Sequence, residues 1–238
     1  MWSTGRSEAA LLAALPVPIE VRPMRNARRM RLRFDEGSGT LKLTCPARMS
    51  RSKALAWALD QRGWIEAQLA RAVPAEPFVD GATIPIEGQD VRIVWYENAP
   101  RTPKLVNAEL RCGGLQVGLA RRVESFLKAR ALKMMSMEVA EYSAAAGLIA
   151  GAVSVGDAGS RWGSCASTGR IRLSWRLILA PPNVRRYVVA HEVAHLRHLD
   201  HGPEFKALEA RLFGPGISEA KALLKRAGPR LRAIGRRR

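Results

Sequence analysis

The chain has 238 residues, of which 47% are hydrophobic and 25% charged, and a formal net charge of +18, a composition that predicts a globular protein of one large or two small domains. The three cysteines, Cys45, Cys112 and Cys165, are far apart and form no C-x-x-C pair, which argues against a disulfide framework and against a structural zinc site of the cysteine type. Because the sequence has no run of about 18 apolar residues and no adequate h-region with a cleavage site, we expect a cytoplasmic protein with no membrane partner.

The first third of the chain predicts strands followed by a helix. Residues 1–16 are expected to form a flexible N-terminal tail. Apolar and polar residues alternate at 19–34 and at 40–44, on either side of a turn-forming segment at 35–39, which predicts a β-hairpin or meander. A helix with apolar residues at helical spacing is expected to follow and to continue through Leu69.

The middle of the chain predicts a second small sheet and a long helix. Turn-forming residues separate short candidate strands, which predict a mostly antiparallel sheet and lie at residues 83–86, 91–96, 104–106 and 115–119. A helix with an apolar stripe is expected at 121–146. The fold class is therefore α+β, with a mostly antiparallel, β-rich part and its helix at 17–119, a mainly helical part at 120–213 and a basic C-terminal tail at 214–238.

The segment that follows leads from turns through a strand into a helix. Residues 161–165, with the sequence RWGSC, contain two turn-forming residues. Residues 170–179 alternate as a strand, with arginines and a serine on the polar face. Asn183 is a suitable N-cap for the next helix, whose apolar face continues into His191 and His195.

Positive charge is concentrated at two places in the chain. Residues 22–33 and 225–238 are rich in arginine and lysine and contain no acidic residue. Such segments attract polyanions, including nucleic acid and nucleotides. Basicity alone is weak evidence, and a compositional bias toward arginine explains it without any ligand. Nucleic acid is therefore a candidate partner through these two segments.

The chemistry of the chain centres on a histidine cluster. All four histidines lie within residues 191–201, and residues 191–195 have the form H-E-x-x-H. Helix positions i and i+4 share a face, so His191 and His195 can direct their imidazoles at one ion. Glu192 is placed to accept a proton from a water bound to that ion. This pattern predicts a zinc-dependent hydrolase with one Zn²⁺ per chain, a zinc-activated water and Glu192 as general base.

The third ligand must come from outside the His191 and His195 pair, because a catalytic zinc site keeps three protein ligands and one open position. His198 lies about 10 Å along the helix axis from His191, too far for the two to share an ion. His201 suits the role better, since the residues at 200–203 allow the helix to end and the chain to fold back. The alternative third ligands are Glu204 and Glu209.

Three elements in fixed order resemble a known family. They are W-G-S-C at residues 162–165, W-R-L-x-x-A-P at 175–181 and H-E-x-x-H-x5-H at 191–201. Together with the early basic strands they resemble the YgjP-like metallopeptidase family, a zincin-like group related to SprT-like and WLM metallopeptidases, with a domain at 17–213. The resemblance implies a zincin-like catalytic part at 120–213, zinc on His191, His195 and His201, and Glu192 as catalytic base.

The resemblance also implies that the W-G-S-C strand borders the active cleft. One departure is Ser174, which stands where the family usually has asparagine. Arg161, Arg176 and Tyr187 are candidates for stabilising an oxyanion. The full set of candidate cleft or substrate residues is Arg161, Trp162, Gly163, Ser164, Arg176 and Tyr187.

The expected substrate is a peptide or protein, and an extended peptide could pair with the edge of the sheet that contains residues 170–179. An alternative on the same zinc site is cleavage of a nucleoside triphosphate such as UTP to the monophosphate and pyrophosphate, which the resemblance permits because a YgjP-like member is described with that activity. The absence of a glycine-rich phosphate loop weakens this alternative. A second alternative is a nucleic-acid-binding module with a structural zinc.

Overall fold

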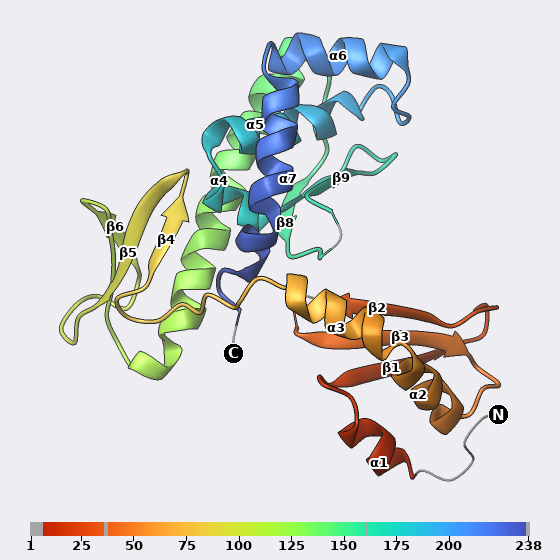
Figure 1. Ribbon diagram of the computed structural model, residues 1–238. Helices are drawn as coiled ribbons and strands as arrows, with labels where there is room; N and C mark the ends of the chain where they lie inside the picture. The colour runs from red at the N-terminus through yellow and green to blue at the C-terminus, as the bar shows by residue number, and fades with distance from the viewer. Residues whose placement is uncertain (1–6, 36–37, 160, 237–238) are drawn as a thin grey trace. The chain divides into compact units, whose positions relative to one another are not determined.

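The computed structural model describes residues 7–35, 38–159 and 161–236. The chain divides into two compact units, an N-terminal unit, Met1–Pro74, and a C-terminal unit, Ala75–Arg238 (Figure 1). Helices and three small sheets confirm the predicted α+β class, although each sheet is mixed and contains one parallel pairing where mostly antiparallel pairing was expected. No helix in the described ranges is both long and apolar enough to cross a membrane.

The sheet of the N-terminal unit has three strands. β1 (Ile19–Met24) pairs in parallel with one edge of β3 (Thr40–Pro46), and β2 (Arg31–Asp35) pairs antiparallel with its other edge. Leu41 and Leu43 alternate inward along β3, as a strand with one buried face requires. The predicted hairpin is present as β2 and β3, while residues 36–37 of its turn lie outside the described residues.

The helices of the N-terminal unit differ from the prediction. Where one helix was expected, α2 (Arg51–Asp60) and α3 (Arg62–Arg71) are separated at Gln61. The expected flexible tail at 1–16 is wrong for its second half, because α1 (Glu8–Ala13) forms there. Leu11 and Leu15 of this short apolar run are buried among the helices and sheet of the unit, which gives the segment a surface to pack on.

Two sheets belong to the C-terminal unit. The first has the order β4 (Thr83–Ile86), β5 (Gln89–Trp95), β7 (Glu109–Cys112) and β6 (Lys104–Val106). Its fourth strand lies at Glu109–Cys112 instead of the predicted 115–119, where Gln116–Gly118 form a 3-10 turn. The second sheet has the order β8 (Val153–Gly156), β10 (Ile171–Ser174) and β9 (Gly163–Cys165), so β9 is an edge strand.

Four helices surround these sheets. They are α4 (Leu119–Ala146), which agrees with the predicted long helix, α5 (Pro182–Ala194), α6 (Pro203–Phe213) and α7 (Ile217–Ala233). α4 ends where Gly147 adopts a left-handed conformation with φ of 64°, a common helix end that glycine adopts without strain. Residues of α4, α5 and α7 share one hydrophobic core, and α7, drawn in front of α5 in Figure 1, contacts it.

The predicted strand at 170–179 is wrong in its second half. β10 ends at Ser174, and residues 175–179 form a 3-10 helix in which every side chain is buried. The guanidinium of Arg176 makes this possible, since it donates two hydrogen bonds to Asp157, at 2.7 and 3.0 Å, and others to the carbonyl oxygens of Leu231 and Ile234. Arg176 therefore has a structural role and is not a cleft residue as predicted.

The predicted basic C-terminal tail at 214–238 is also wrong for most of its length. α7 begins at Ile217, and its inner face buries Leu231 and Ala233, with Ile234 just beyond the helix end. The basic residues of the segment occupy the remaining faces, as in an amphipathic helix. Arg230 pairs with Glu76 at 3.0 Å, which further fixes the end of the helix.

Shortening Leu231 to alanine tests whether α7 is part of the core. Leu231 is 4% exposed, so Leu231→Ala should lower the free energy of unfolding by about 2–5 kcal/mol, the usual cost of such a cavity. Urea unfolding followed by tryptophan fluorescence measures the effect. The matched control is Leu132→Ala on α4, since Leu132 is 39% exposed and should cost far less. Equal, small effects of the two substitutions would mean that α7 is not packed.

Candidate metal centre

α5 carries the H-E-x-x-H motif. Its start differs slightly from the prediction, because Pro181 is the N-cap and Pro182 occupies the first turn, where a missing N–H costs nothing. Val184, Val189 and Val193 are buried against the core and fix the rotation of the helix. The helix ends at Ala194, so His195 is its C-cap residue.

Three of the four histidines come together at the end of α5. One ring nitrogen from each of His191, His195 and His201 lies within 4.8 Å of the other two. The Nε2 atoms of His191 and His201 are 3.3 Å apart. His201 reaches this position because the chain turns after α5, where the backbone N–H of Gly202 donates to the Asp200 carboxylate at 2.9 Å, before Pro203 starts α6.

The remaining residues considered as ligands lie elsewhere. The imidazole of His198 is 3.6 Å from the carboxylate of Glu204, and neither residue belongs to the cluster found among the described residues. Glu209, from α6, contacts the outer side of the His191 ring instead of joining the three nitrogens. The sequence-based preference for His201 over Glu204 and Glu209 thus agrees with the geometry of the cluster.

Hydrogen bonds fix two of the three rings from behind. Nδ1–H of His191 donates to Oε1 of Glu209 at 2.7 Å, and Nδ1–H of His195 donates to the carbonyl oxygen of His198 at 2.9 Å. With Nδ1 protonated in this way, each ring presents the lone pair of Nε2 to the centre of the cluster. Burial lowers the pKa of His191 despite the opposing effect of Glu209, so its neutral, metal-binding form is favoured.

The donor set fits a zinc ion. Tetrahedral zinc with Zn–N bonds of about 2.0–2.1 Å places its ligand nitrogens about 3.3–3.4 Å apart. The measured separation of the His191 and His201 Nε2 atoms, 3.3 Å, agrees with that value. Three imidazole nitrogens also match the donor type of catalytic zinc sites.

α6 supports the cluster through two side chains whose roles the sequence did not reveal. Phe205 is 1% exposed, and its ring centre lies 4.5–5.1 Å from those of His191, His195 and His201. Glu209 also accepts a hydrogen bond from the Tyr187 hydroxyl at 3.2 Å. Tyr187, a predicted oxyanion stabiliser, is therefore engaged in holding Glu209, and burial and that carboxylate raise the pKa of its hydroxyl.

Glu192 lies buried beside the cluster and against strand β9. It is 5% exposed, and burial raises its pKa to about 7, although the charge of Arg161 and a hydrogen bond from the backbone of Cys165 oppose the shift. A Cβ atom on Gly163 would lie 2.4 Å from Oε1 of Glu192, so any larger residue there would displace the carboxylate. The W-G-S-C segment thus receives the carboxylate of the H-E-x-x-H helix.

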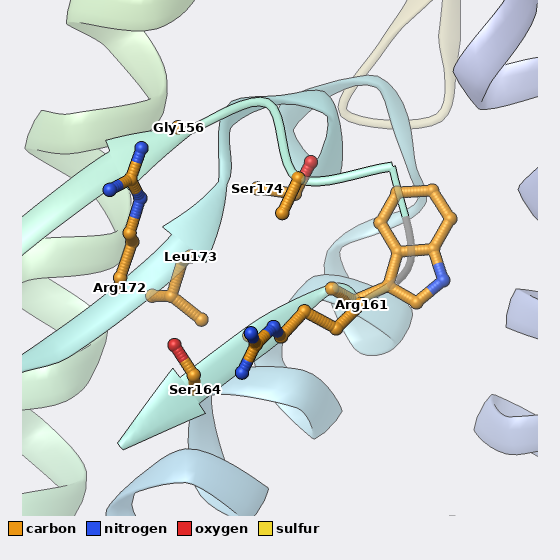
Figure 2. Close-up of a pocket in the computed structure, with 9 residues that line it drawn as sticks. Gly156, Arg161, Ser164, Arg172, Leu173 and Ser174 are labelled. Atoms are coloured by element: carbon orange, nitrogen blue, oxygen red, sulfur yellow. The ribbon is translucent and has the colours of Figure 1, made fainter. Parts of the chain in front are cut away.

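A pocket of about 180 Å³ opens on the sheet of β8, β9 and β10 (Figure 2). Four of the predicted cleft residues line it, namely Arg161, Trp162, Gly163 and Ser164. Sequence reasoning missed the contribution of Arg172 and Ser174 from β10, although both were placed on the polar face of the predicted strand. Helix α7 covers one face of the Trp162 ring, and the guanidinium carbon of Arg232 on that helix lies 4.5 Å from the ring centre.

Comparison with known proteins assigns the chain to a family. A family model described as "YgjP-like, metallopeptidase domain" matches residues 28–227, most of the chain. Comparison with curated proteins and with solved structures gave no match. The family description supports a metallopeptidase-like hydrolase and implies a metal, for which the three histidines are the candidates. The chain belongs to the YgjP-like metallopeptidase family.

Proposed function

We propose that the protein is a zinc-dependent metallopeptidase in which His191, His195 and His201 hold one Zn²⁺ and Glu192 is the general base. The observation that carries the proposal is the convergence of three imidazole nitrogens within 4.8 Å, beside a buried carboxylate. When bound, the metal would polarise a water molecule and lower its pKa to about 7.

Glu192 supplies the proton chemistry in this proposal. With a pKa of about 7, its carboxyl group is suited both to accept the proton that the nucleophilic water loses and to return it to the leaving amine. The backbone hydrogen bond from Cys165 orients the carboxylate, which lies close against Gly163. Arg161 places a positive charge near the reacting groups and is the remaining candidate for stabilising an oxyanion.

Strand β9 offers a place for an extended peptide. Its inner edge is occupied, since Ser174 N–H donates to the Trp162 carbonyl at 2.7 Å and Ala166 N–H donates to the Arg170 carbonyl at 2.9 Å. Main-chain groups of an antiparallel pair alternate in direction, so those of Gly163 and the carbonyl of Cys165 point to the other edge, where the Cys165 N–H already donates to Glu192. A peptide added along that edge would run beside Glu192, which supports a peptide substrate.

The other two functions considered have less support. For a nucleoside triphosphate, the sequence offers no glycine-rich loop that would bind the phosphates. For nucleic acid, part of the charge in the two basic segments is paired, as Arg22 is with Glu20 and Arg230 with Glu76. Release of pyrophosphate from UTP and salt-dependent DNA binding are the assays for these alternatives.

Removing two imidazoles tests the metal site. Wild-type protein, purified without a histidine tag, should contain about one zinc per chain by plasma emission, and His191→Ala/His195→Ala should contain none. His198→Ala is the matched control, because His198 is in the same segment but outside the cluster, and it should keep the metal. Equal metal content in all three proteins would contradict the assignment.

Replacing the proposed base tests the mechanism. Glu192→Gln keeps the shape of the side chain but cannot accept a proton, so kcat for casein cleavage should fall about 100-fold or more. Zinc content should match that of the wild type, which separates loss of the base from loss of the metal. Full activity of this variant with zinc bound would exclude Glu192 as the base.

Replacing Glu209 tests its support of His191. Glu209→Gln removes a charged acceptor from Nδ1 of His191 and should weaken zinc affinity about 10- to 100-fold, as such changes behind metal-ligating histidines do. Competition with a chromogenic chelator measures the affinity. Glu204→Gln on the same helix is the matched control, because the Glu204 side chain is 84% exposed and contacts no residue of the cluster closely. Equal affinities for the two variants would show that Glu209 does not act on the metal.

A further inference from the structure

The described helices of the N-terminal unit pack on one face of its sheet and leave the other face open. Leu41 and Leu43 of β3 turn inward and share the core of the unit with apolar residues of α1, α2 and α3. The alternate residues, Lys42 and Thr44, therefore belong to the opposite face, which we call the outer face. Within the described part of the unit, no side chain of the outer face belongs to the core.

The strand register places basic side chains next to one another on the outer face. Thr44 of β3 pairs with Arg22 of β1 on one side and with Arg31 of β2 on the other, so these three residues form a row across the sheet. Paired residues of neighbouring strands lie on the same face. The next row, two residues along the strands, consists of Glu20, Lys42 and Arg33. Four of the six side chains in the two rows are therefore basic.

More arginines lie at the end of the sheet where β1 and β3 finish. Residues 25–30 connect β1 to β2 there, and residues 47–50 follow β3. The backbone N–H of Ala47 donates to the carbonyl oxygen of Met24 at 3.2 Å, which holds the two segments together. Both segments carry exposed arginines, namely Arg25, Arg28, Arg29 and Arg48. We call these four residues and the two rows of the outer face the basic surface.

Most of the positive charge of the basic surface is not paired. Exposed acidic neighbours contact three of its members, since Glu20 pairs with Arg22 and Lys42, and Asp35 pairs with Arg33. Such exposed pairs are weak, so a phosphate can replace the carboxylate. In residues 7–35, 38–159 and 161–236, the basic residues of this surface that form no ion pair are Arg25, Arg28, Arg29, Arg31 and Arg48.

The charge is also separated between the two sides of the unit. Apart from Glu20 and Asp35, the acidic residues described in this unit lie on its helices, on the opposite side of the sheet, and are Glu8, Asp60 and Glu66. A general bias of the composition toward arginine would not by itself produce this arrangement. The outer face and its adjoining loops are therefore suited to a polyanion.

The composition of the basic surface fits nucleic acid better than a protein or a membrane. Protein interfaces have an apolar and aromatic centre, and segments that bind membrane surfaces insert apolar side chains. Among the exposed large apolar residues described, only Met24 borders the basic surface. Interfaces with nucleic acid are polar and positively charged, and the planar guanidinium group binds two phosphate oxygens at once.

The same residues favour a double strand. Proteins that bind single strands stack the bases on aromatic side chains, and neither the two rows of the outer face nor residues 25–30 and 47–50 include an aromatic residue. Strands lie about 4.8 Å apart, so the Cα atoms of Arg22 and Arg31 are about 10 Å apart across β3. This distance lies between the groove widths of B-form DNA, about 6 and 12 Å, so these long side chains can contact phosphates on both sides of a groove.

We propose that the basic surface of the N-terminal unit binds the phosphate backbone of duplex DNA without reading its sequence. This surface contains no residue of the candidate metal centre. DNA binding is therefore an activity in addition to the proposed peptidase function and does not depend on it.

The salt dependence of DNA binding tests the proposal. Fluorescence anisotropy with the full-length protein and labelled duplexes of about 20 base pairs, in two unrelated sequences, gives the association constant between about 50 and 200 mM KCl. Each phosphate contact contributes about −0.9 to the slope of log K against log salt, so the five unpaired arginines predict a slope of about −4 or steeper. A slope shallower than about −2, or affinities that differ more than about tenfold between the two sequences, would overturn the proposal.

Substitutions assign the binding to the basic surface. Arg28→Gln/Arg31→Gln should make the slope shallower by about two and lower the affinity by about tenfold per arginine near 0.1 M salt. Arg62→Gln/Arg71→Gln on α3 is the matched control, because it removes the same charge from the helical side of the unit and should bind like the wild type. All four side chains are exposed, so thermal unfolding should be unchanged. Equal losses for the two pairs would mean that DNA responds only to net charge, against the proposal.

Competing ligands and a second segment complete the test. Duplex DNA should bind more tightly than single-stranded DNA of the same length, duplex RNA, polyglutamate or phosphatidylserine vesicles, and tighter binding of any of these would contradict the choice of partner. Lys225→Gln/Arg226→Gln on α7 should bind like the wild type, and a loss there in place of the sheet would move the site. The His191→Ala/His195→Ala protein should bind DNA normally, whether or not the wild type cleaves casein, so the two proposals can fail separately.

Discussion

The site depends on one contact, the burial of the Glu192 carboxylate against the main chain of Gly163. Removing a charged carboxylate from water is costly unless polar groups replace the water. Here the backbone of Cys165 and the charge of Arg161 supply part of that replacement, and the carboxyl group retains a pKa of about 7. Helix α5 and strand β9 therefore meet at this carboxylate, and a side chain at position 163 would displace it. The helix motif and the strand motif form one functional part, although a turn, a strand and a 3-10 helix separate them along the chain.

The imidazole cluster depends in the same way on α6. His191 and His195 share a helix, but helical geometry alone leaves their rings free to rotate about χ1 and χ2. The Glu209 carboxylate fixes the first ring, the carbonyl of His198 fixes the second, and Phe205 packs against all three. Burial raises the pKa of Glu209, but the hydrogen bond from His191 and the charge of Lys221 outweigh it and hold the pKa below the usual range. Glu209 is thus held in its ionised form, the form that orients the imidazole.

The sequence predicted the features that depend on residues close together in the chain, and it did not predict those that depend on contacts between distant segments. The placement of His191, Glu192 and His195 follows from helical spacing alone, and that of His201 from the turn-forming residues beside it, so short-range rules were sufficient. The 3-10 helix at Trp175–Leu179 was missed, because it depends on Arg176 bonding to groups far along the chain, Asp157 and the carbonyls at the end of α7. The helix in place of a basic tail was missed, because its few apolar residues pack on a core formed by distant segments. The alternation of apolar and polar residues around Arg176 predicted a strand, because the sequence does not distinguish a buried, paired arginine from an exposed one.

The net charge of +18 illustrates why position carries more information than composition. In the C-terminal unit, Arg176 and Arg185 are buried and paired with carboxylates, so their charges stabilise the fold and are not available to a ligand. Arg232 lies in a segment that seemed to be a basic tail, yet it stacks on Trp162. Arg161 and Arg172 line the pocket on the sheet of β8, β9 and β10, and the charge of Arg161 also acts on the buried carboxylate of Glu192. The part that an arginine plays therefore follows from the groups around its guanidinium and not from the total charge of the chain.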